Sequence, residues 1–353
     1  MSTKDFTANV ISATKVVPDG NFKDSKASGI WDINEALDLI KGGNWPNVAN
    51  INPAAFVDAL FQITLYNGTG SSNAVTTGID AVNNDSLLWI KRRSGASDHN
   101  LVDTKRGIAT AGTGLMSSNS TGGSNSFADY LNATTTGFTA LHSGNDTNGD
   151  GETYVAWQFR AQPKFFDVVT WTGTGSAMTI DHNLGQVPGM IIVKSTSATY
   201  DWAVWHREFT GSTDYIKLNT AAAKTDSAGV FGNGSNYLTP TSTQFFVGGN
   251  NQVSGEDGGG YVAYLFAHNN DDGGFGEPGD QDIIKCGSYT GNGSNDGPTI
   301  NLGFEPQWLM IKDADGAENW QIFDNMRGMS VGQYPVHLYP NSAAAEGTIQ
   351  NQF

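Results

Sequence analysis

The chain has 353 residues, of which 35 are acidic and 19 are basic, so its formal net charge is −16. This acidic balance argues against a nucleic-acid partner, which needs clustered Lys and Arg. One cysteine cannot form an intrachain disulfide or a thiolate zinc site. No apolar stretch approaches the ~20 residues of a membrane helix, so we expect no membrane insertion.

Residues 1–61 are predicted to form an attachment segment with two short helices. Asp32 and Glu35 have the spacing of a capping box, and Gly42 can end that helix. Pro53 suits the first turn of a second helix. Two short helices cannot bury their apolar side chains alone, so we expect a partner to cover them. The expected interface residues are Trp31, Leu37, Ile40, Trp45, Phe56 and Leu60.

The rest of the chain contains three similar units. Three strings share the order aromatic, any, Gly, any, Gly, Ser, and they begin at Tyr66, Trp171 and Tyr289. A lysine that ends an apolar run follows each string after 23 or 25 residues, at Lys91, Lys194 and Lys312. His99, Trp202 and Trp320 each lie eight residues past that lysine. So many matched offsets indicate tandem homologous domains.

Each unit is predicted to be an antiparallel β-sandwich, which makes the chain mainly β. Short runs rich in Val, Ile, Trp and Tyr alternate with period two and are separated by Gly, Asn, Ser and Thr clusters. At about 100 residues, a unit is large enough to bury its own core. The predicted boundaries are 62–163 for unit 1, 164–270 for unit 2, 271–281 for an acidic Gly-rich linker and 282–353 for unit 3.

The third unit is expected to lack its last strand. The closing segments Tyr154–Phe159 and Tyr261–Phe266 begin 88 and 90 residues after Tyr66 and Trp171. The same spacing from Tyr289 falls beyond Phe353. Either the chain is a fragment of a longer protein, or a neighbouring chain completes the sheet by strand addition.

We find no motif that supports catalysis, so we expect a protein that is not an enzyme and has no cofactor. The Gly-x-Gly-Ser strings recur in β units, which favours hairpin turns over phosphate loops. Asp103 and Asp324 correspond between units, but unit 2 has His206 there, which suggests a solvated or inter-strand position.

Two candidate binding sites remain. Asp146, Asn148 and Asp150 match the first half of a calcium loop, but Trp157 stands where the bidentate Glu is needed. An ordinary Asn/Asp-rich turn is therefore favoured over calcium. Trp205 lies on the opposite strand phase from Val204 and could be exposed for stacking on a sugar.

Several strings resemble the repeated domain of virion structural proteins from tailed bacteriophages, especially tail-fibre-like proteins of marine phages. They are Asn183–Lys194, Tyr154–Phe159, Tyr289–Ser294, His337–Asn341 and the lead-in Ala27–Trp31 with Gly43–Pro46. The resemblance covers nearly the whole chain and carries over no catalytic residues. It implies a virion component of a tail fibre or its attachment region, assembled in the host cytoplasm as a homo-oligomer, with a trimer expected.

The favoured hypothesis is a non-enzymatic virion structural protein that binds another tail or capsid protein through residues 1–61 and presents its β domains outward. A second hypothesis is an adhesin that binds carbohydrate on the host surface. A third is a depolymerase of surface polysaccharide, which would need paired carboxylates. No acid recurs in all three units with a plausible partner, so structural use of the acids is favoured.

Overall fold

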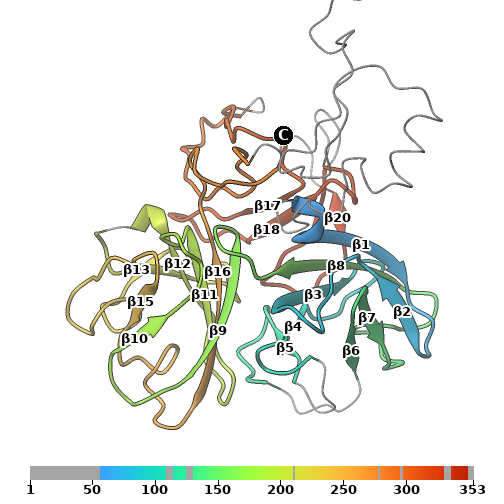
Figure 1. Cartoon of the computed structure of the whole chain (residues 1–353), viewed down its shortest axis with the longest axis horizontal. Coiled ribbons are helices and arrows are strands. Elements are labelled where there is room, and N and C mark those ends of the chain that lie inside the picture. The colour runs from blue at the N-terminus through green and yellow to red at the C-terminus, as the bar shows by residue number, and fades with distance from the viewer. Residues whose placement is uncertain are drawn as a thin grey trace, which may run out of the picture. The chain divides into compact units, whose positions relative to one another are not determined.

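The computed structural model describes residues 56–108, 114–124, 130–209, 211–276, 279–294, 297–329 and 335–348 (Figure 1). Apart from Phe56 to Phe61, the predicted attachment segment lies outside these residues. The start of the second predicted helix also lies outside the described residues, among which Val57–Ala59 forms a short 3-10 helix, η3. Phe61 instead begins strand β1 (Phe61–Asn67) and pairs with Phe159.

Units 1, 2 and 3 of the sequence are called repeats 1, 2 and 3 below. The first repeat contains two sheets that pack face to face. Its strands are β1 (Phe61–Asn67), β2 (Asn73–Thr76), β3 (Ser86–Arg92), β4 (Asn100–Asp103), β5 (Met116–Ser117), β6 (Leu131–Thr134), β7 (Gly137–Ala140) and β8 (Thr153–Arg160). One sheet has the order β1-β8-β3-β4-β5, and the other has the order β2-β7-β6. A shared core that includes Val75, Ile90, Val102 and Phe138 joins them. This arrangement is a β-sandwich.

The second repeat has the same plan. Its strands are β9 (Phe166–Thr172), β10 (Met178–Asp181), β11 (Met190–Ser195), β12 (Ala203–His206), β13 (Asp214–Lys217), β14 (Thr225–Asp226), β15 (Gln244–Val247) and β16 (Gly260–Phe266). A short 3-10 helix, η4 (Arg207–Phe209), follows β12. The large sheet has the order β14-β13-β12-β11-β16-β9, and β10 pairs with β15 to form the small one. The core between them includes Ile191, Trp205, Phe245 and Leu265.

The third repeat contains four strands in the described residues. β17 (Trp308–Ile311) pairs with β18 (Gln321–Asp324), and β19 (Val336–His337) pairs with β20 (Gly347–Thr348). A single bridge from Ile322 to Leu338 links the two pairs. Residues 284–290, which correspond to β1 and β9 by their spacing from Tyr289, form no strand.

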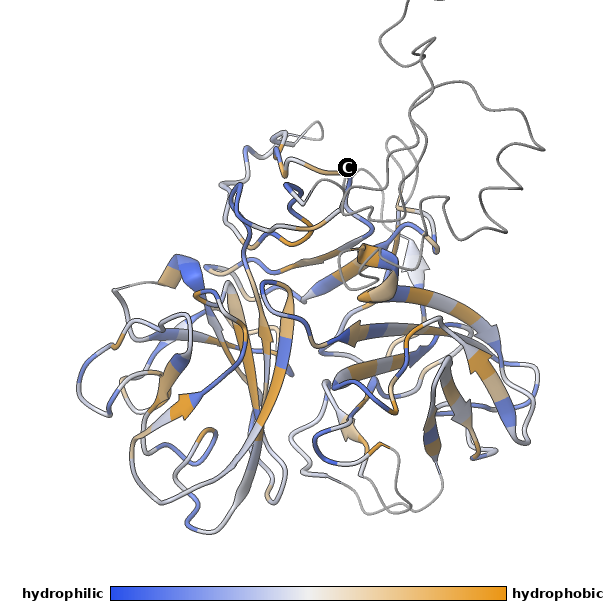
Figure 2. Ribbon diagram, in the orientation of Figure 1, coloured by the Kyte–Doolittle hydropathy of each residue, from blue (hydrophilic) through white to orange (hydrophobic). Residues whose placement is uncertain are grey.

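The predicted mainly β, antiparallel fold is therefore confirmed. Hydrophobic residues concentrate on the strands, whereas the loops are mostly hydrophilic (Figure 2). The closing strands depart from simple alternation, because every residue from Tyr154 to Phe159 and from Tyr261 to Phe266 is buried. Both faces of these strands are thus covered. On one face, Trp157 and Tyr264 contact residues of another repeat. Val57–Phe353 forms one compact unit that holds all three repeats.

Candidate functional site

Matched backbone hydrogen bonds join each repeat to another. In every repeat, the carbonyl group two residues past the repeated lysine accepts an N–H from a different repeat. The three bonds are Glu346 N to Arg93 O at 3.1 Å, Ser124 N to Thr196 O at 2.7 Å, and Lys224 N to Ala314 O at 2.8 Å. Repeat 1 thus contacts repeat 3, repeat 2 contacts repeat 1, and repeat 3 contacts repeat 2. The contacts close a three-membered cycle.

In repeats 2 and 3, the side chain eight residues past the lysine follows the same cycle. The Trp202 indole N–H lies 3.0 Å from the carbonyl oxygen of Ser117 in repeat 1. The Trp320 indole N–H lies 3.0 Å from the carbonyl oxygen of Lys217 in repeat 2. The corresponding residue in repeat 1, His99, is fully buried and accepts the Trp89 indole N–H at 3.0 Å. Burial, together with the charges of Lys91 and Arg327, holds the pKa of His99 well below its ordinary value, so its ring is neutral.

A buried carboxylate also links repeats 1 and 2. Asp103 is fully buried and binds Arg106 Nε at 2.5 Å. The Arg106 backbone N–H donates to the other Asp103 oxygen at 2.9 Å. The Tyr264 hydroxyl, from the closing strand of repeat 2, donates to Asp103 at 2.8 Å. Three donors therefore share one carboxylate away from water, which makes each bond charge-assisted.

The same constellation recurs between repeats 3 and 1. Asp324 binds Arg327 Nε at 2.6 Å, and neither side chain is exposed. The Trp157 indole N–H, from the closing strand of repeat 1, donates to Asp324 at 2.9 Å. The Arg327 guanidinium carbon lies 5.3 Å from the centre of the Trp157 ring, within range of a cation–π contact.

This constellation was not predicted from the sequence. Asp103 and Asp324 were expected in solvated or inter-strand positions, and the structure buries both of them. The signal was present as an Asp-x-x-Arg-Gly string at Asp103 and Asp324, 12 residues past the repeated lysine in both repeats. A carboxylate three residues before an arginine at matched offsets is a pattern that can indicate a buried pair.

Two of the repeated lysines are buried, and their amines donate hydrogen bonds to backbone carbonyl groups of loops. Lys91 and Lys194 have no exposed surface. Lys194 Nζ donates to the carbonyl groups of Tyr200 at 2.8 Å and of Thr121, in repeat 1, at 2.9 Å. Lys91 Nζ donates to its neighbouring carbonyl at 2.8 Å. Burial lowers the pKa of each amine to about 8. These lysines therefore hold loop backbone in place rather than presenting a charge to solvent.

Repeat 2 departs from the carboxylate pattern at His206. Burial lowers the pKa of this imidazole to about 4, so the ring is neutral at physiological pH. Its Nδ1 accepts the backbone N–H of Glu208 at 3.4 Å. The position thus offers a neutral side chain where the other two repeats offer a buried ion pair.

The proposed sugar-stacking role of Trp205 is wrong. Trp205 is 1% exposed and packs in the core of repeat 2 with Ile191, Phe245 and Leu265. Its indole N–H has no hydrogen-bond partner among the described residues. The prediction failed because it took the Trp205 face of β12 to be open to water, whereas Phe245 and Val247 of β15, in the small sheet of the same repeat, cover that face.

The candidate interface residues are only partly described. Trp31, Leu37, Ile40 and Trp45 lie outside the described residues. Phe56 is half-buried. Leu60 has no exposed surface, so its side chain is not available to an outside partner, and we correct its assignment. Its carbonyl accepts the N–H of Arg160 at 2.8 Å, which places it beside the end of β8.

The candidate calcium ligands do not converge on one point. Asn148 is fully buried and its side-chain oxygen already accepts the Thr69 N–H at 3.0 Å and the Asn73 amide at 3.1 Å. Asp146 accepts the Ser97 hydroxyl at 2.9 Å, and Asp150 is exposed. Within the described ranges, no three His, Cys, Asp or Glu side chains group so that they could hold a metal ion. Asn148 instead ties the opening Gly-rich turn to the turn before β8.

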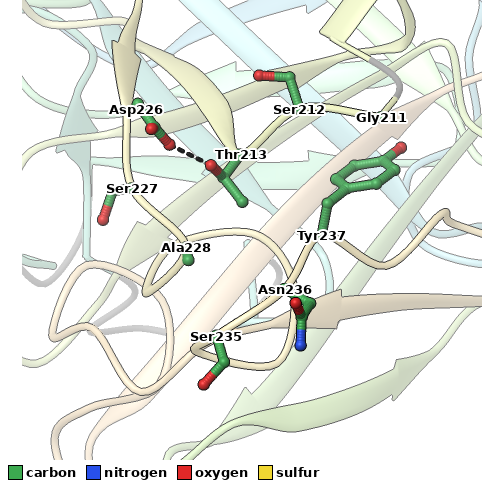
Figure 3. Close-up of a pocket in the computed structure, with 9 residues that line it drawn as sticks. All are labelled: Gly211, Ser212, Thr213, Asp226, Ser227, Ala228, Ser235, Asn236 and Tyr237. Atoms are coloured by element: carbon green, nitrogen blue, oxygen red, sulfur yellow. Dashed lines mark hydrogen bonds between the residues drawn. The ribbon is translucent and has the colours of Figure 1, made fainter.

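A shallow polar hollow lies on repeat 2 (Figure 3). Three chain segments line it: Gly211–Thr213, Asp226–Ala228 and Ser235–Tyr237. The Thr213 hydroxyl bonds the Asp226 carboxylate, and Tyr237 packs partly on the core of the repeat. The Tyr237 hydroxyl is buried and has no partner among the described residues. The hollow therefore combines carboxylate, amide and hydroxyl groups with one aromatic ring.

Comparisons with known proteins identify a family but no function. None of the helices in the described ranges is long and apolar enough to cross a membrane. No curated protein and no solved structure matches the chain. Residues 58–353, which include all three repeats, match the family described as "Domain of unknown function (DUF7483)". The chain therefore belongs to the DUF7483 family.

Proposed function

We propose that this chain is a non-enzymatic structural protein of a virion, in a phage tail fibre or its attachment region. The observation that carries the proposal is the cycle of buried contacts between the three repeats. The resemblance of the repeat strings to tail-fibre-like proteins supports the assignment to a virion.

The contacts suit a part that must keep its shape under load. Each connection between repeats combines a backbone hydrogen bond with buried side-chain donors, such as Trp202 on Ser117 and Tyr264 on Asp103. If two repeats separated partly, the buried polar groups of such a pair would lose their partners. That cost opposes partial separation of the repeats. A body of this kind serves as a rigid spacer.

Attachment is assigned to the N-terminal segment. Trp31, Leu37, Ile40, Trp45 and Phe56 supply the apolar surface that a tail or capsid protein would cover. Leu60 is removed from this set because it is buried. Homo-oligomers are the usual state of such fibres, and a trimer is the expected one.

Labelling of particles tests this proposal. Antibodies raised against the β repeats are applied to purified virions of a phage that encodes the chain, and the bound gold is located by electron microscopy. The proposal predicts labelling at one fixed position on the tail. Absence of the protein from particles that carry every other tail component would refute it.

Deletion of Met1–Asn50 tests the attachment role separately. The repeats should remain folded, because Val57–Phe353 is a compact unit by itself. The deleted protein should no longer enter particles. Incorporation at the level of the full chain would refute the attachment role without touching the virion assignment.

The polar hollow favours carbohydrate binding as a second candidate function. Sugars are bound by carboxylate, amide and hydroxyl side chains beside an aromatic ring, and Asp226, Asn236 and Tyr237 provide all of these. A glycan array probed with the full chain tests this candidate. Asn236→Ala should abolish a specific signal, whereas Asn83→Ala, on an exposed turn of repeat 1, should not. Equal binding by both variants would exclude the hollow.

A further inference from the structure

The closing strand occupies the same place in the first two repeats. β8 lies between β1 and β3, and β16 lies between β9 and β11 (Figure 1). Each closing strand therefore pairs on both edges, and the opening strand pairs with no other neighbour in its sheet. The closing strand is what holds the opening strand in the sheet.

The register of this pairing is identical in the two repeats. Lys91 lies opposite Val155, and Lys194 lies opposite Val262. The residue before each lysine lies opposite Ala156 or Ala263, and the one before that lies opposite Trp157 or Tyr264. Both strands follow the order Tyr-Val-Ala-aromatic-any-Phe, called the closing sequence below.

The third repeat has the acceptor edge without this strand. Among the described residues, β17 pairs with β18 alone, and β18 corresponds to β4 and β12. The edge of β17 that corresponds to the closing-strand edge of β3 and β11 therefore has no described strand on it. All four β17 residues are only half-buried, whereas the corresponding residues of β3 and β11 are buried.

The opening segment of the third repeat fits the same explanation. Residues 284–290 align with β1 and β9 but form no strand, and Tyr289 is 50% exposed. Its counterparts Tyr66 and Trp171 stack on Tyr154 and Tyr261 of the closing strands, with ring centres 5.0 and 5.6 Å apart. In repeats 1 and 2 the closing strand is both the strand partner and the ring partner of this segment, and no described residue of repeat 3 takes that place.

The acceptor edge is held in position by another repeat. The ring of Trp308, at the start of β17, lies 5.6 Å from that of Phe159 and 6.5 Å from that of Phe61. The Trp308 indole nitrogen is buried without a hydrogen-bond partner among the described residues. Repeat 1 therefore fixes one end of β17, so its free edge is preorganised for pairing.

We propose that the free edge of β17 is a binding site for one antiparallel β-strand with the closing sequence, which inserts between β17 and residues 284–290. The strand sets its valine opposite Lys312, its alanine opposite Ile311 and its aromatic residue opposite Met310. Main-chain hydrogen bonds supply affinity, and alternate side-chain positions supply specificity, as in other strand-addition sites.

The cyclic order of the contacts assigns a second neighbour to this strand. The fourth residue of the closing sequence contacts Asp324 of repeat 3 from β8, and Asp103 of repeat 1 from β16. In the same cycle, the fourth residue of the bound strand faces repeat 2, where His206 stands at the corresponding position. Because the site has no buried carboxylate, it should accept phenylalanine there as well as tyrosine.

Peptide binding tests the proposal directly. The probe is a fluorescent peptide with the sequence of Gly259–His268, added to the full chain and followed by anisotropy. Saturable binding is expected. A matched peptide with Ala263→Pro loses a ladder N–H and should bind at least about tenfold more weakly. Hydrogen exchange should slow in both flanking segments, 308–312 and 284–290.

The position of the bound peptide is tested by cross-linking. A photoreactive residue in place of Val262 of the peptide should label the chain next to Lys312, and mass spectrometry locates the label. Ile311→Pro in the chain should abolish binding, whereas Thr225→Pro on β14, an edge strand of repeat 2, should not. The cross-link requires no variant chain, so it decides the question even where Ile311→Pro impairs folding.

Three results would overturn the proposal. One is the absence of binding at peptide concentrations up to roughly 1 mM. Another is cross-linking to β14 or to scattered positions. The third is self-association of the chain through β17 that the peptide does not displace, which would assign this edge to a second copy. None of these results bears on whether the protein is part of a virion.

Discussion

Replacing Asp103 with asparagine should destabilise the protein strongly although it changes few atoms. Asp103 is fully buried and is the counter-ion of Arg106, whose Nε lies 2.5 Å away. The neutral amide leaves the arginine charge uncompensated in a site with little access to water. Breaking a buried pair in this way costs about 3–5 kcal/mol.

Tyr264→Phe is the matched probe of the contact between repeats. It removes only the hydroxyl that donates to Asp103 at 2.8 Å and leaves the ion pair in place. A hydrogen bond to a charged group contributes about 1.5–3 kcal/mol. In the double variant the two costs should be less than additive, with a coupling of about 0.5–3 kcal/mol, because both side chains share one carboxylate.

Urea unfolding of the full chain, followed by tryptophan fluorescence, measures all three variants. Lys105→Ala is the control, since Lys105 pairs with Asp85 in the same repeat but both side chains are 39% exposed. Such a surface pair contributes about 0–1 kcal/mol. A cost below about 1 kcal/mol for Asp103→Asn, no larger than the control, would refute the role of the buried carboxylate.

Three further predictions concern single side chains. Trp202→Phe should destabilise more than Trp205→Phe, because both are buried but only Trp202 donates its indole N–H across the repeats; equal losses in urea unfolding would contradict this. Burial lowers the pKa of Lys194 from 10.5 to about 8. Between these two pH values the unfolded state binds more protons than the folded state. Lys194 therefore contributes a rise in the free energy of unfolding from about pH 8 to about pH 10.5. Unfolding free energies measured against pH should lose that part of the slope, up to ~1.4 kcal/mol per pH unit, in Lys194→Met; an unchanged slope would refute the assignment. Asn148→Ala should lower the free energy of unfolding by about 1–3 kcal/mol, equally with calcium and with a chelator; stabilisation by calcium in the parent alone would restore the metal hypothesis.

The sequence predicts the strands well because their patterns recur from one repeat to the next. The closing strings at Tyr154 and Tyr261 become β8 and β16, and the lysine-terminated runs become β3, β11 and β17. Glycine at positive φ confirms the turn interpretation of the opening strings, since Gly70 and Gly175 have φ angles of 63° and 71°. Local periodicity and turn chemistry are sufficient for this level of structure.

Packing between repeats could not be predicted in the same way. Trp202 and Trp205 look alike in sequence, yet one contacts another repeat and the other fills the core of its own. Period-two alternation shows which side chains share a face of a strand, but it does not show what covers each face. The prediction for Trp205 failed at this point.

The candidate site residues show the same difference between what the sequence reveals and what it does not. Asp103 and Arg106 were visible as matched offsets, but the burial of Asp103 against Tyr264 of the neighbouring repeat was not. The polar hollow was not visible, because its three segments are separate in sequence and lack counterparts in the repeat pattern. Offsets within one repeat predict contacts within that repeat, and loops that differ between repeats have to be seen in three dimensions.

Differential scanning calorimetry of the full chain shows whether the buried contacts join the three repeats into one body. We predict that Val57–Phe353 unfolds in one cooperative transition, with calorimetric and van't Hoff enthalpies that agree. Asp103→Asn should shift this whole transition to lower temperature. Separate transitions of domain size, with Asp103→Asn moving only one of them, would contradict a single cooperative body.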